Sequence, residues 1–266
     1  MDVETAGLLD GRVALVSGVG PGLGRSIART LAGAGADVAL AARRRGPLAA
    51  VAAEIEGLGR RAVVIPTDIA DPEQCRRLAD AAADRLGRID VLVNNAFTEE
   101  DWREPFDGFD PDRWRAPVAV NLLGTLALSQ AAVPHLRAAG GGSVIMITTL
   151  SVKNPVPLLA GYAASKRALT TAAQAMAREL GPHRIRVNCV APGHIQGASL
   201  DEYFAWIADR RGVDAAAVAA EIASLNALGC IATPDEIAGA VLFFASDLSR
   251  VVTGQTLDVN CGRTLG

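Results

Sequence analysis

Short apolar runs alternate with amphipathic, alanine-rich segments along most of this chain. The runs predict strands at residues 12–17, 37–42, 62–66, 89–94, 142–148, 186–190 and 255–259. Helices are predicted between them, one ending near residue 33 and others at about 47–58, 72–86, 161–180 and 234–245. Another long helix is predicted to run through Asn121 towards Leu136, with Pro117 near its start. The strand runs are rich in β-branched residues without polar alternation, which is typical of strands buried on both faces of a parallel sheet. Repeated strand–helix–strand units therefore predict an α/β fold, a doubly wound parallel sheet with helices on both faces.

Composition narrows the class of protein. The chain of 266 residues suits one large α/β domain, and it contains no low-complexity linker and no sign of a second domain. It has no uninterrupted run of about 20 apolar residues. Its first five residues are acidic and lack the basic start of a signal peptide. A formal net charge of −3 gives no general attraction for nucleic acid or anionic lipid. These features predict a cytoplasmic protein without a nucleic-acid or membrane partner.

The four cysteines, Cys75, Cys189, Cys230 and Cys261, are widely scattered along the sequence. They form no C-x-x-C pair and have no nearby histidine, so no metal site is predicted. They are predicted to be reduced and mostly buried.

A cluster of glycines follows the first predicted strand. After Ser17 come Gly18, Gly22 and Gly24, in a G-x-x-x-G-x-G spacing rather than the more familiar G-x-G-x-x-G. Glycines let a backbone turn tightly and approach a pyrophosphate, which then binds at the N-terminus of the next helix. Such clusters also form plain turns, but the position between a first strand and a first helix favours dinucleotide binding.

The end of the second predicted strand bears on which dinucleotide binds. An acidic residue there would hydrogen-bond the ribose 2′-hydroxyl of NAD, whereas a basic residue would accommodate a 2′-phosphate. The expected acid position is Ala42, and Arg43 follows it directly. Because a guanidinium is well suited to phosphate, the sequence favours NADP(H) over NAD(H). The alternative is an exposed basic loop, Arg43–Arg45, that needs no ligand.

Polar residues also end the third and fourth predicted strands, at Thr67-Asp68 and at Asn94-Asn95-Ala96. Ligands bind at the carboxyl ends of the strands in open α/β sheets. A cofactor crevice is therefore predicted there, with the Asp68 carboxylate accepting a hydrogen bond from the adenine amino group. The alternative is that these residues cap the helices that follow.

A long connection is predicted after the fourth strand, at about 97–117. It carries Trp102, Phe106, Phe109 and Trp114. A loop beside a cofactor is a natural substrate wall, although some of these aromatic side chains are expected to be ordinary packing.

Asn121 lies in an otherwise apolar helical stretch. A buried amide needs hydrogen-bond partners, so Asn121 is either a structural hydrogen-bonding group or part of a proton path.

Tyr162 and Lys166 form the central candidate for chemistry. They lie four positions apart in a predicted helix, and therefore on one face of it. A buried lysine ammonium beside a phenol would lower the tyrosine pKa from its usual value of about 10. Such a phenol can pass a proton near neutral pH, as carbonyl–alcohol chemistry requires. The alternative is a pair of side chains on a solvated helix face.

Together these motifs resemble those of the short-chain dehydrogenase/reductase family, and the similarity extends over nearly the whole chain. Each motif is weak alone, but their order and spacing are specific. The resemblance implies a Rossmann-type, seven-stranded, three-layer α/β/α fold and hydride transfer between a nicotinamide and a carbonyl or alcohol. The matching residues are Gly18, Gly22, Gly24, Asp68, Asn94, Asn95, Ala96, Asn121, Tyr162, Lys166, Pro192, Gly193, Thr253, Gly254 and Gln255.

The resemblance also implies a role for each residue. Tyr162 would be the acid/base, and Lys166 would hold the nicotinamide ribose and lower the tyrosine pKa. Asn121 would support a water relay to the lysine, and a serine would orient the substrate oxygen. The implied cofactor-binding residues are Ser17, Gly18, Gly22, Leu23, Gly24, Arg43, Asp68, Ile69, Asn95, Ala96, Tyr162, Lys166, Pro192, Gly193 and Ile195.

Three positions depart from the family pattern. Thr149 stands at the serine position, thirteen residues before the tyrosine, and Ser151 is the runner-up for that role. Phe97 replaces the glycine of the usual N-N-A-G motif and is predicted to narrow the site or to pack against substrate. The threonine usually found shortly after Pro-Gly is missing, which leaves the carboxamide contact to the backbone of Ile195 or to Gln196.

A helical insertion is predicted at about 196–228, and in similar proteins this region is a mobile lid. His194, Tyr203 and Trp206 are predicted to contact substrate, with packing on the core as the alternative. The last strand and the helix of Tyr162 resemble the surfaces through which relatives form tetramers, so a homotetramer or homodimer is expected.

These inferences predict an NADP(H)-dependent oxidoreductase that interconverts a ketone and a secondary alcohol on a fairly apolar substrate of the cyclic or polyketide-like kind. Enoyl reduction is disfavoured, because related enoyl reductases resemble a Tyr-x6-Lys pattern and the residue at that spacing is Leu159. One alternative is a non-catalytic NADP(H)-binding sensor or scaffold, which Thr149 and Phe97 favour. The other is an NAD-dependent alcohol dehydrogenase.

Overall fold

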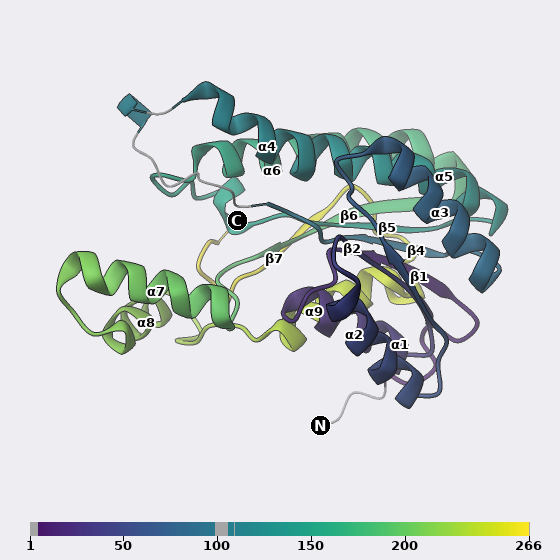
Figure 1. The fold of residues 1–266 in the computed structure, drawn as a ribbon, viewed down its shortest axis with the longest axis horizontal. Coiled ribbons are helices and arrows are strands. Elements are labelled where there is room, and N and C mark those ends of the chain that lie inside the picture. The colour runs from purple at the N-terminus through teal and green to yellow at the C-terminus, as the bar shows by residue number, and fades with distance from the viewer. Residues whose placement is uncertain (1–4, 99–105, 109, 266) are drawn as a thin grey trace.

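A computed structural model describes residues 5–98, 106–108 and 110–265 of the chain. Its centre is a seven-stranded parallel sheet of order β3-β2-β1-β4-β5-β6-β7 (Figure 1). The strand order reverses between β1 and β4, and ligands bind at such a switch point. The strands are β1 Val13–Ser17, β2 Asp37–Ala42, β3 Ala62–Pro66, β4 Val91–Asn94, β5 Gly142–Ile147, β6 Ile185–Pro192 and β7 Thr256–Val259.

Helices cover both faces of the sheet, which confirms the predicted three-layer, Rossmann-type architecture. One layer contains α1 Leu23–Gly33, α2 Arg45–Gly57 and α9 Pro234–Ala245, and the other contains α3 Pro72–Leu86, α5 Thr125–Ala138 and α6 Ala160–Leu180 (Figure 1). An apolar core lies under each layer. Alternate residues of β1 serve the two cores, Ala14 and Val16 one of them and Val13 and Leu15 the other. This alternation explains why the central strands lack polar positions.

The two edge strands differ from the prediction of strands buried on both faces. Residues 62–65 of β3 are half-buried and Pro66 is exposed, and Leu257 of β7 is 40% exposed. Each edge strand has a neighbour on one side only, so its flank stays open. The other element bounds agree with the predictions to within about two residues, apart from the helix around Asn121.

The long helix predicted around Asn121 is irregular. It begins as α4 Arg115–Pro117, continues as a π-helical stretch, η3 Val118–Gly124, and then becomes α5. Pro117, which has no backbone N–H to donate, directly precedes the π-helical stretch. Because π-helical turns are rare and often lie at functional sites, this irregularity indicates that the region around Asn121 is a candidate functional site.

This same helical stretch, Asp112–Ala138, is long and apolar enough to cross a membrane by length and composition alone, which the sequence had not predicted. About 39% of its apolar part is buried inside the fold. Leu128, Ala132 and Leu136 of this stretch pack in the apolar core beneath its layer.

The predicted lid consists of two helices, α7 Ala198–Arg211 and α8 Ala215–Ser224. They form a lobe at one end of the sheet (Figure 1). The lobe has a small apolar core of its own around Phe204, Ala208 and Val218.

Candidate active site

The glycine turn after β1 packs tightly against the end of β4. Gly18 has a φ of +74°, and a Cβ at this residue would overlap the backbone of Ala96. A Cβ on Gly24 would overlap the carbonyl oxygen of Gly18, which accepts a hydrogen bond from Asn95 Nδ2 at 2.8 Å. Packing therefore requires glycine at Gly18 and Gly24.

Gly22 has a different role from these two glycines. It is exposed, it caps α1 without any side-chain hydrogen bond, and a Cβ built on it meets nothing within 4 Å. Helix N-termini carry unpaired N–H groups and a partial positive charge. The start of α1, at Leu23, is thus open to an anion such as a pyrophosphate.

A cavity of about 280 Å³ lies at the carboxyl ends of β1 to β4. It joins the predicted Arg43, Asp68 and Ile69 to the strand end at Asn95 and Ala96. The cavity is lined by Gly18, Ala41, Ala42, Arg43, Thr67, Asp68, Ile69, Asn95, Ala96, Phe97, Thr98, Ala116 and Val120.

Asp68 does not cap the following helix, α3, whose N-cap is Asp71, and its contact with adenine stays a prediction. One carboxylate oxygen, Oδ1, accepts a hydrogen bond from Ala70 N at 3.0 Å, as a turn-capping residue does. The backbone N–H of Asp68 donates to Gln74 Oε1 at 3.0 Å. The same side chain also lines the cavity, so it is held rigidly at the cavity wall.

Two polar side chains at the strand ends are hydrogen-bonded within the protein, one to a neighbouring strand and one to helix α5. Ser17 is fully buried, and its hydroxyl donates to the carbonyl of Val93 at 3.4 Å. Asn94 Nδ2 donates to Ser129 Oγ at 3.0 Å. Ser17 thus reaches a neighbouring strand with its side chain, and only its backbone remains for a ligand.

Lys166 is a buried cation. It is 2% exposed, and its Nζ donates to the carbonyl of Ile147, the last residue of β5, at 2.8 Å. Among the described residues no carboxylate forms an ion pair with it. Burial lowers the pKa of the Lys166 ammonium to about 8. Lys166 thus stands at the end of β5 on the same helix, α6, as Tyr162, and one turn after it.

Asn121 is connected to α6 through a residue that the sequence analysis missed, Ser165. Asn121 is fully buried, and its Nδ2 lies 3.2 Å from Ser165 Oγ, to which it donates. Ser165 Oγ donates in turn to the backbone carbonyl of Tyr162 at 2.7 Å. Asn121 Oδ1 accepts from Thr98 N at 2.9 Å. Ser165 lies three residues after Tyr162 and therefore near it on the helix surface, but this spacing alone does not single out a serine in an alanine-rich helix.

Thr149 follows β5 by two residues, which places it just beyond the carbonyl that Lys166 contacts. It caps a short 3₁₀ helix, η4 Leu150–Val152, by accepting from Ser151 N at 3.3 Å. Its hydroxyl also donates to Ser151 Oγ at 3.4 Å. Ser151 itself lies in this 3₁₀ helix and is only 6% exposed, whereas Thr149 is half-buried.

Phe97 connects the cavity to Tyr162. It lines the cavity, is 49% exposed, and meets the Tyr162 ring edge-on with 6.4 Å between ring centroids. Trp114, from the predicted substrate loop, packs on Gly161, where a Cβ would lie 2.8 Å from the indole ring. Trp102, Phe109 and the Phe106 side chain lie outside the described part of the chain.

The segment after β6 joins the site to the lid. Pro192 is the last residue of β6, and Gly193 N donates to Val259 O at 3.1 Å. Ile195 pairs with Ala232 in a β-bridge. Gln196 Nε2 donates to the Ile231 carbonyl at 2.7 Å, so of the two candidates for a carboxamide contact the Gln196 side chain is already engaged.

A ladder of rings extends from His194 along α7. His194 stacks on Tyr203 with 6.2 Å between ring centroids, and Tyr203 stacks on Trp206 at 6.1 Å. The guanidinium of Arg210 covers Trp206 at 3.9 Å. Burial, and then the nearby Arg263, lowers the pKa of His194, so its imidazole is neutral at pH 7.

Comparison with known proteins agrees with this geometry. The profile of the family described as Enoyl-(Acyl carrier protein) reductase matches residues 18–264. The 7alpha-hydroxysteroid dehydrogenase of Escherichia coli (strain K12) is 33% identical over 254 residues, covering 96% of this chain and 94% of that protein. The short-chain reductase protein NovJ of Streptomyces niveus is 36% identical over 251 residues, covering 94% of this chain and 93% of that protein.

A solved structure, carveol dehydrogenase from Mycobacterium avium in complex with NAD, superposes with a TM-score of 0.91 at 31% identity, covering 97% of this chain and 99% of that one. The chain belongs to the short-chain dehydrogenase/reductase family of oxidoreductases.

Proposed function

We propose that this protein interconverts a ketone and a secondary alcohol on a fairly apolar substrate of the cyclic or polyketide-like kind, with NADP(H) as cofactor and Tyr162 as the acid/base. The observation that carries this proposal is Lys166, a buried ammonium without a carboxylate partner among the described residues, one helical turn from Tyr162. A protein keeps such a group at a cost, and perturbed buried cations cluster at functional sites.

The residues fit a nicotinamide dinucleotide. The open start of α1 suits a pyrophosphate, the cavity at Arg43 and Asp68 suits an adenosine, and the Pro192–Ile195 segment suits the nicotinamide end. When bound, the cofactor supplies or accepts the hydride. Everything else in the reaction falls to side chains of this chain.

In the direction of reduction, the Tyr162 hydroxyl gives its proton to the substrate oxygen. The Lys166 ammonium nearby stabilises the phenolate that remains. Thr149 donates a hydrogen bond to the same oxygen and polarises it. Asn121 acts as a positioning residue, because its amide already bonds Thr98 and Ser165 and so ties the π-helical turn to α6. It thereby supports a water relay to Lys166.

Arg43 is the basis for the choice of NADP(H). It lines the cavity together with Ala42, where an NAD-selective site would have an acid. The M. avium relative was crystallised with NAD, which makes the NAD-dependent alternative the one to test directly.

The test is to measure Kd for NADPH and for NADH in Arg43→Ala. A lost charge-assisted hydrogen bond amounts to about 1.5–3 kcal/mol, or about 10- to 100-fold, and we expect that loss for NADPH alone. Arg44→Ala is the matched control, since Arg44 is exposed and does not line the cavity. Equal losses for both cofactors in Arg43→Ala would overturn the assignment.

The reaction class is supported by two relatives whose names state hydroxysteroid and carveol, both alcohols. The family description, by contrast, names an enoyl reductase. The residue at the Tyr-x6-Lys position is Leu159, which only caps α6 and has no acidic hydroxyl. Purified protein with NADPH is therefore expected to consume cyclic ketones and not enoyl thioesters, followed as loss of NADPH absorbance; the reverse preference would refute the proposal.

A non-catalytic NADP(H) sensor is the alternative from a different class. Thr149 at the serine position and Phe97 over Tyr162 favour it. Tight binding of NADPH without turnover of any ketone, unchanged in Thr149→Ser, would establish it.

We also propose a homotetramer or homodimer built on β7 and α6. The β7 edge is open, and the nearby Leu257, Leu248 and Val251 are 40%, 63% and 86% exposed. Sedimentation velocity of the purified chain tests this assembly, and a monomer at micromolar concentration would contradict it.

A further inference from the structure

Two cysteines far apart in the sequence meet at the base of the lid. Cys230 and Cys261 are separated by 31 positions, yet their sulfurs lie 3.6 Å apart. Cys230 is exposed and Cys261 half-buried, so the prediction of buried cysteines is wrong for these two and confirmed for Cys75 and Cys189.

The backbone on both sides holds this pair in register. Cys230 lies in the connection from α8 to α9, and Cys261 follows β7. Leu228 N donates to the Cys261 carbonyl at 3.0 Å, and Asn226 Nδ2 donates to the Cys230 carbonyl at 2.6 Å. Gly262 packs against Ala227 so closely that a Cβ there would lie 2.6 Å from the alanine methyl. The two sulfurs are therefore close because the backbone segments that carry them pack against each other.

The two sulfurs are not equivalent, and they differ from the other cysteines. Burial raises the pKa of both Cys75 and Cys189 to about 11, so these thiols are inert inside the core. Burial, the neighbouring Cys230 and the Glu236 carboxylate raise the pKa of Cys261. Cys230 is the exposed member, and an oxidant reaches it first.

We propose that Cys230 and Cys261 form a thiol oxidation site, at which a peroxide converts the pair into an intramolecular disulfide. The Cys230 thiol gives up its proton, its thiolate attacks one peroxide oxygen and the O–O bond breaks. The leaving hydroxide takes up that proton, so that a sulfenic acid on Cys230 and one water molecule form. The Cys261 sulfur then attacks the sulfenic sulfur, the S–O bond breaks, and a second water molecule leaves. The two sulfurs together lose two electrons, which reduce the peroxide.

The bond requires only a local movement. A disulfide has an S–S distance of about 2.05 Å, so the sulfurs have to approach by about 1.5 Å from their present 3.6 Å. Cys261 has a φ of +55° and lies in a turn after β7, and Gly229, next to Cys230, has a φ of +65°.

The disulfide would fix the base of the lid beside the nicotinamide end of the site. The segment after Cys230 already pairs with the residues after β6, through the Ile195–Ala232 bridge and the hydrogen bond from Gln196 N to Ala232 O at 2.9 Å. A covalent link from Cys230 to Cys261 ties this segment to the end of β7 as well. Any change in ketone turnover caused by this link rests on the proposed function, whereas formation of the disulfide does not.

The experiment is to titrate the purified protein with hydrogen peroxide and to follow thiols, intact mass and peptides under non-reducing conditions. We expect the count of free thiols to fall from four to two, a mass decrease of two hydrogens, one peptide linking Cys230 to Cys261, and reversal by dithiothreitol. Cys230 should react at least about 10-fold faster than Cys75. Hydrogen exchange of residues 225–233 should slow on oxidation.

Cys230→Ser and Cys261→Ser should each abolish the linked peptide, while Cys75→Ala, at an inert core thiol, should keep it. A sulfinic acid at Cys230 without a link, a disulfide between two chains, or equal reaction of all four thiols would overturn the proposal. These readouts use the wild-type protein, so a variant that fails to fold does not decide the outcome. If the disulfide forms but ketone reduction was never present, only the proposed function fails.

Discussion

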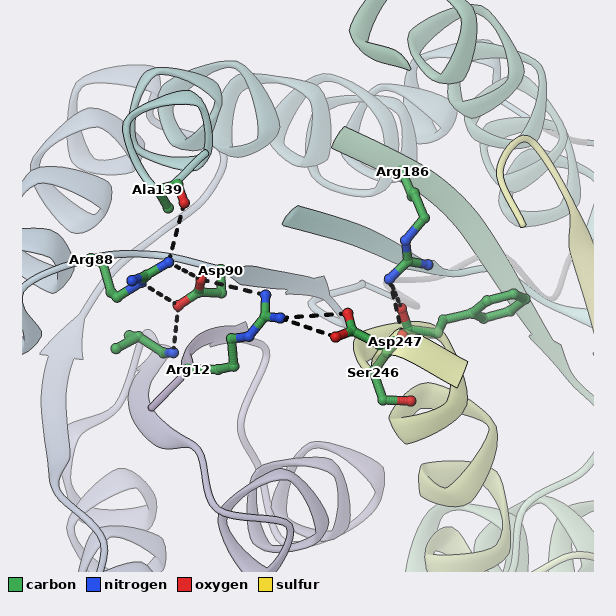
Figure 2. A network of polar contacts seen from close by, with 9 residues as sticks. Arg12, Arg88, Asp90, Ala139, Arg186, Ser246 and Asp247 are labelled. Carbon is green, nitrogen blue, oxygen red and sulfur yellow. Dashed lines mark hydrogen bonds and ion pairs between the residues drawn. The ribbon is translucent and has the colours of Figure 1, made fainter. Parts of the chain in front are cut away.

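A buried charged group lies at each end of the seven-stranded sheet, and the two groups differ in the hydrogen-bond and ion-pair partners that the protein gives them. At the amino end the Asp90 side chain is fully buried just before β4. Its carboxylate accepts from Val13 N at 2.9 Å and from the Arg88 guanidinium at 2.9 and 2.6 Å, and Arg12 lies 3.8 Å away (Figure 2).

The same network extends to the last helix. Arg12 reaches Asp247 at 3.3 Å, in the 3₁₀ turn after α9. Arg186 of β6 donates to the Phe244 and Ser246 carbonyls at 2.9 and 3.2 Å (Figure 2). Every charged group in this network has partners within the protein, and the network links strands to helices. These groups are therefore already satisfied without a ligand.

At the carboxyl end, the buried Lys166 ammonium has a carbonyl oxygen as partner and no carboxylate among the described residues. Lys166 has a backbone carbonyl as its hydrogen-bond acceptor, and burial lowers its pKa to about 8. The comparison shows that burial alone does not separate a structural charge from a functional one. The distinguishing property is whether the surrounding protein already satisfies the charge.

The largest expected effect at the carboxyl end is that of Tyr162→Phe. Removing a general acid/base lowers turnover by about 10²- to 10⁴-fold, while NADPH binding and the unfolding midpoint should stay near those of the wild type. Steady-state kinetics with a ketone, together with a fluorescence titration of NADPH, measure this. A variant with a normal rate would remove Tyr162 from the mechanism.

Asp90→Ala is the corresponding change at the amino end. It leaves the buried Val13 N–H without its acceptor and removes the partner of Arg88 and Arg12, whose side chains are 44% and 39% exposed. Losing a hydrogen bond to a charged group costs about 1.5–3 kcal/mol. Urea denaturation should show that loss, with ketone turnover per folded molecule unchanged. Asp247→Ala is the matched control, because the Asp247 side chain is 80% exposed and an exposed pair contributes at most about 1 kcal/mol. Similar losses in the two variants would contradict the comparison.

Lys166→Met should stabilise the protein while it impairs catalysis. The pKa of about 8 in the folded protein lies below the ordinary lysine value of 10.5. The unfolded chain therefore binds more protons between these pH values, and wild-type stability rises across that window. The cost of the buried ammonium is complete below pH 8 and amounts to at most about 3 kcal/mol. We expect Lys166→Met to raise the free energy of unfolding at pH 7 and to lose this advantage by pH 10.5.

The stability gain is to be measured by urea denaturation of the cofactor-free protein at both pH values. If Lys166→Met raises the free energy of unfolding equally at pH 7 and pH 10.5, burial of the charged ammonium does not destabilise the wild-type protein.

The smallest effect is expected for Thr149→Ser, because both side chains have a hydroxyl that donates and accepts. Its kcat should stay within about 10-fold of the wild type, whereas Thr149→Val, which loses the hydroxyl, should lose about 10-fold or more. If the valine variant keeps the wild-type rate, Ser151 becomes the candidate for the serine role.

The sequence anticipated the fold and most of the cavity wall. The apolar runs of the strands, and the polar residues that follow them, such as Asp68 and Asn95, are local signals. The parallel sheet then brings these polar residues together at its carboxyl edge. The π-helical turn was missed because the apolar pattern around Asn121 is compatible with an ordinary α-helix. Ser165 was missed because a serine in an alanine-rich helix has no distinctive pattern until its partner Asn121 is known.

By itself, the sequence determined the order of strands and helices, the glycine turn and the spacing of Tyr162 and Lys166, since these depend on near neighbours along the chain. Tertiary structure alone decided which polar groups are satisfied. The Asp90 network includes a contact between Arg12 and Asp247, 235 positions apart, Lys166 contacts the carbonyl at the end of β5, and Cys230 meets Cys261 across 31 positions. Such contacts depend on the packing of distant segments, which no local pattern encodes.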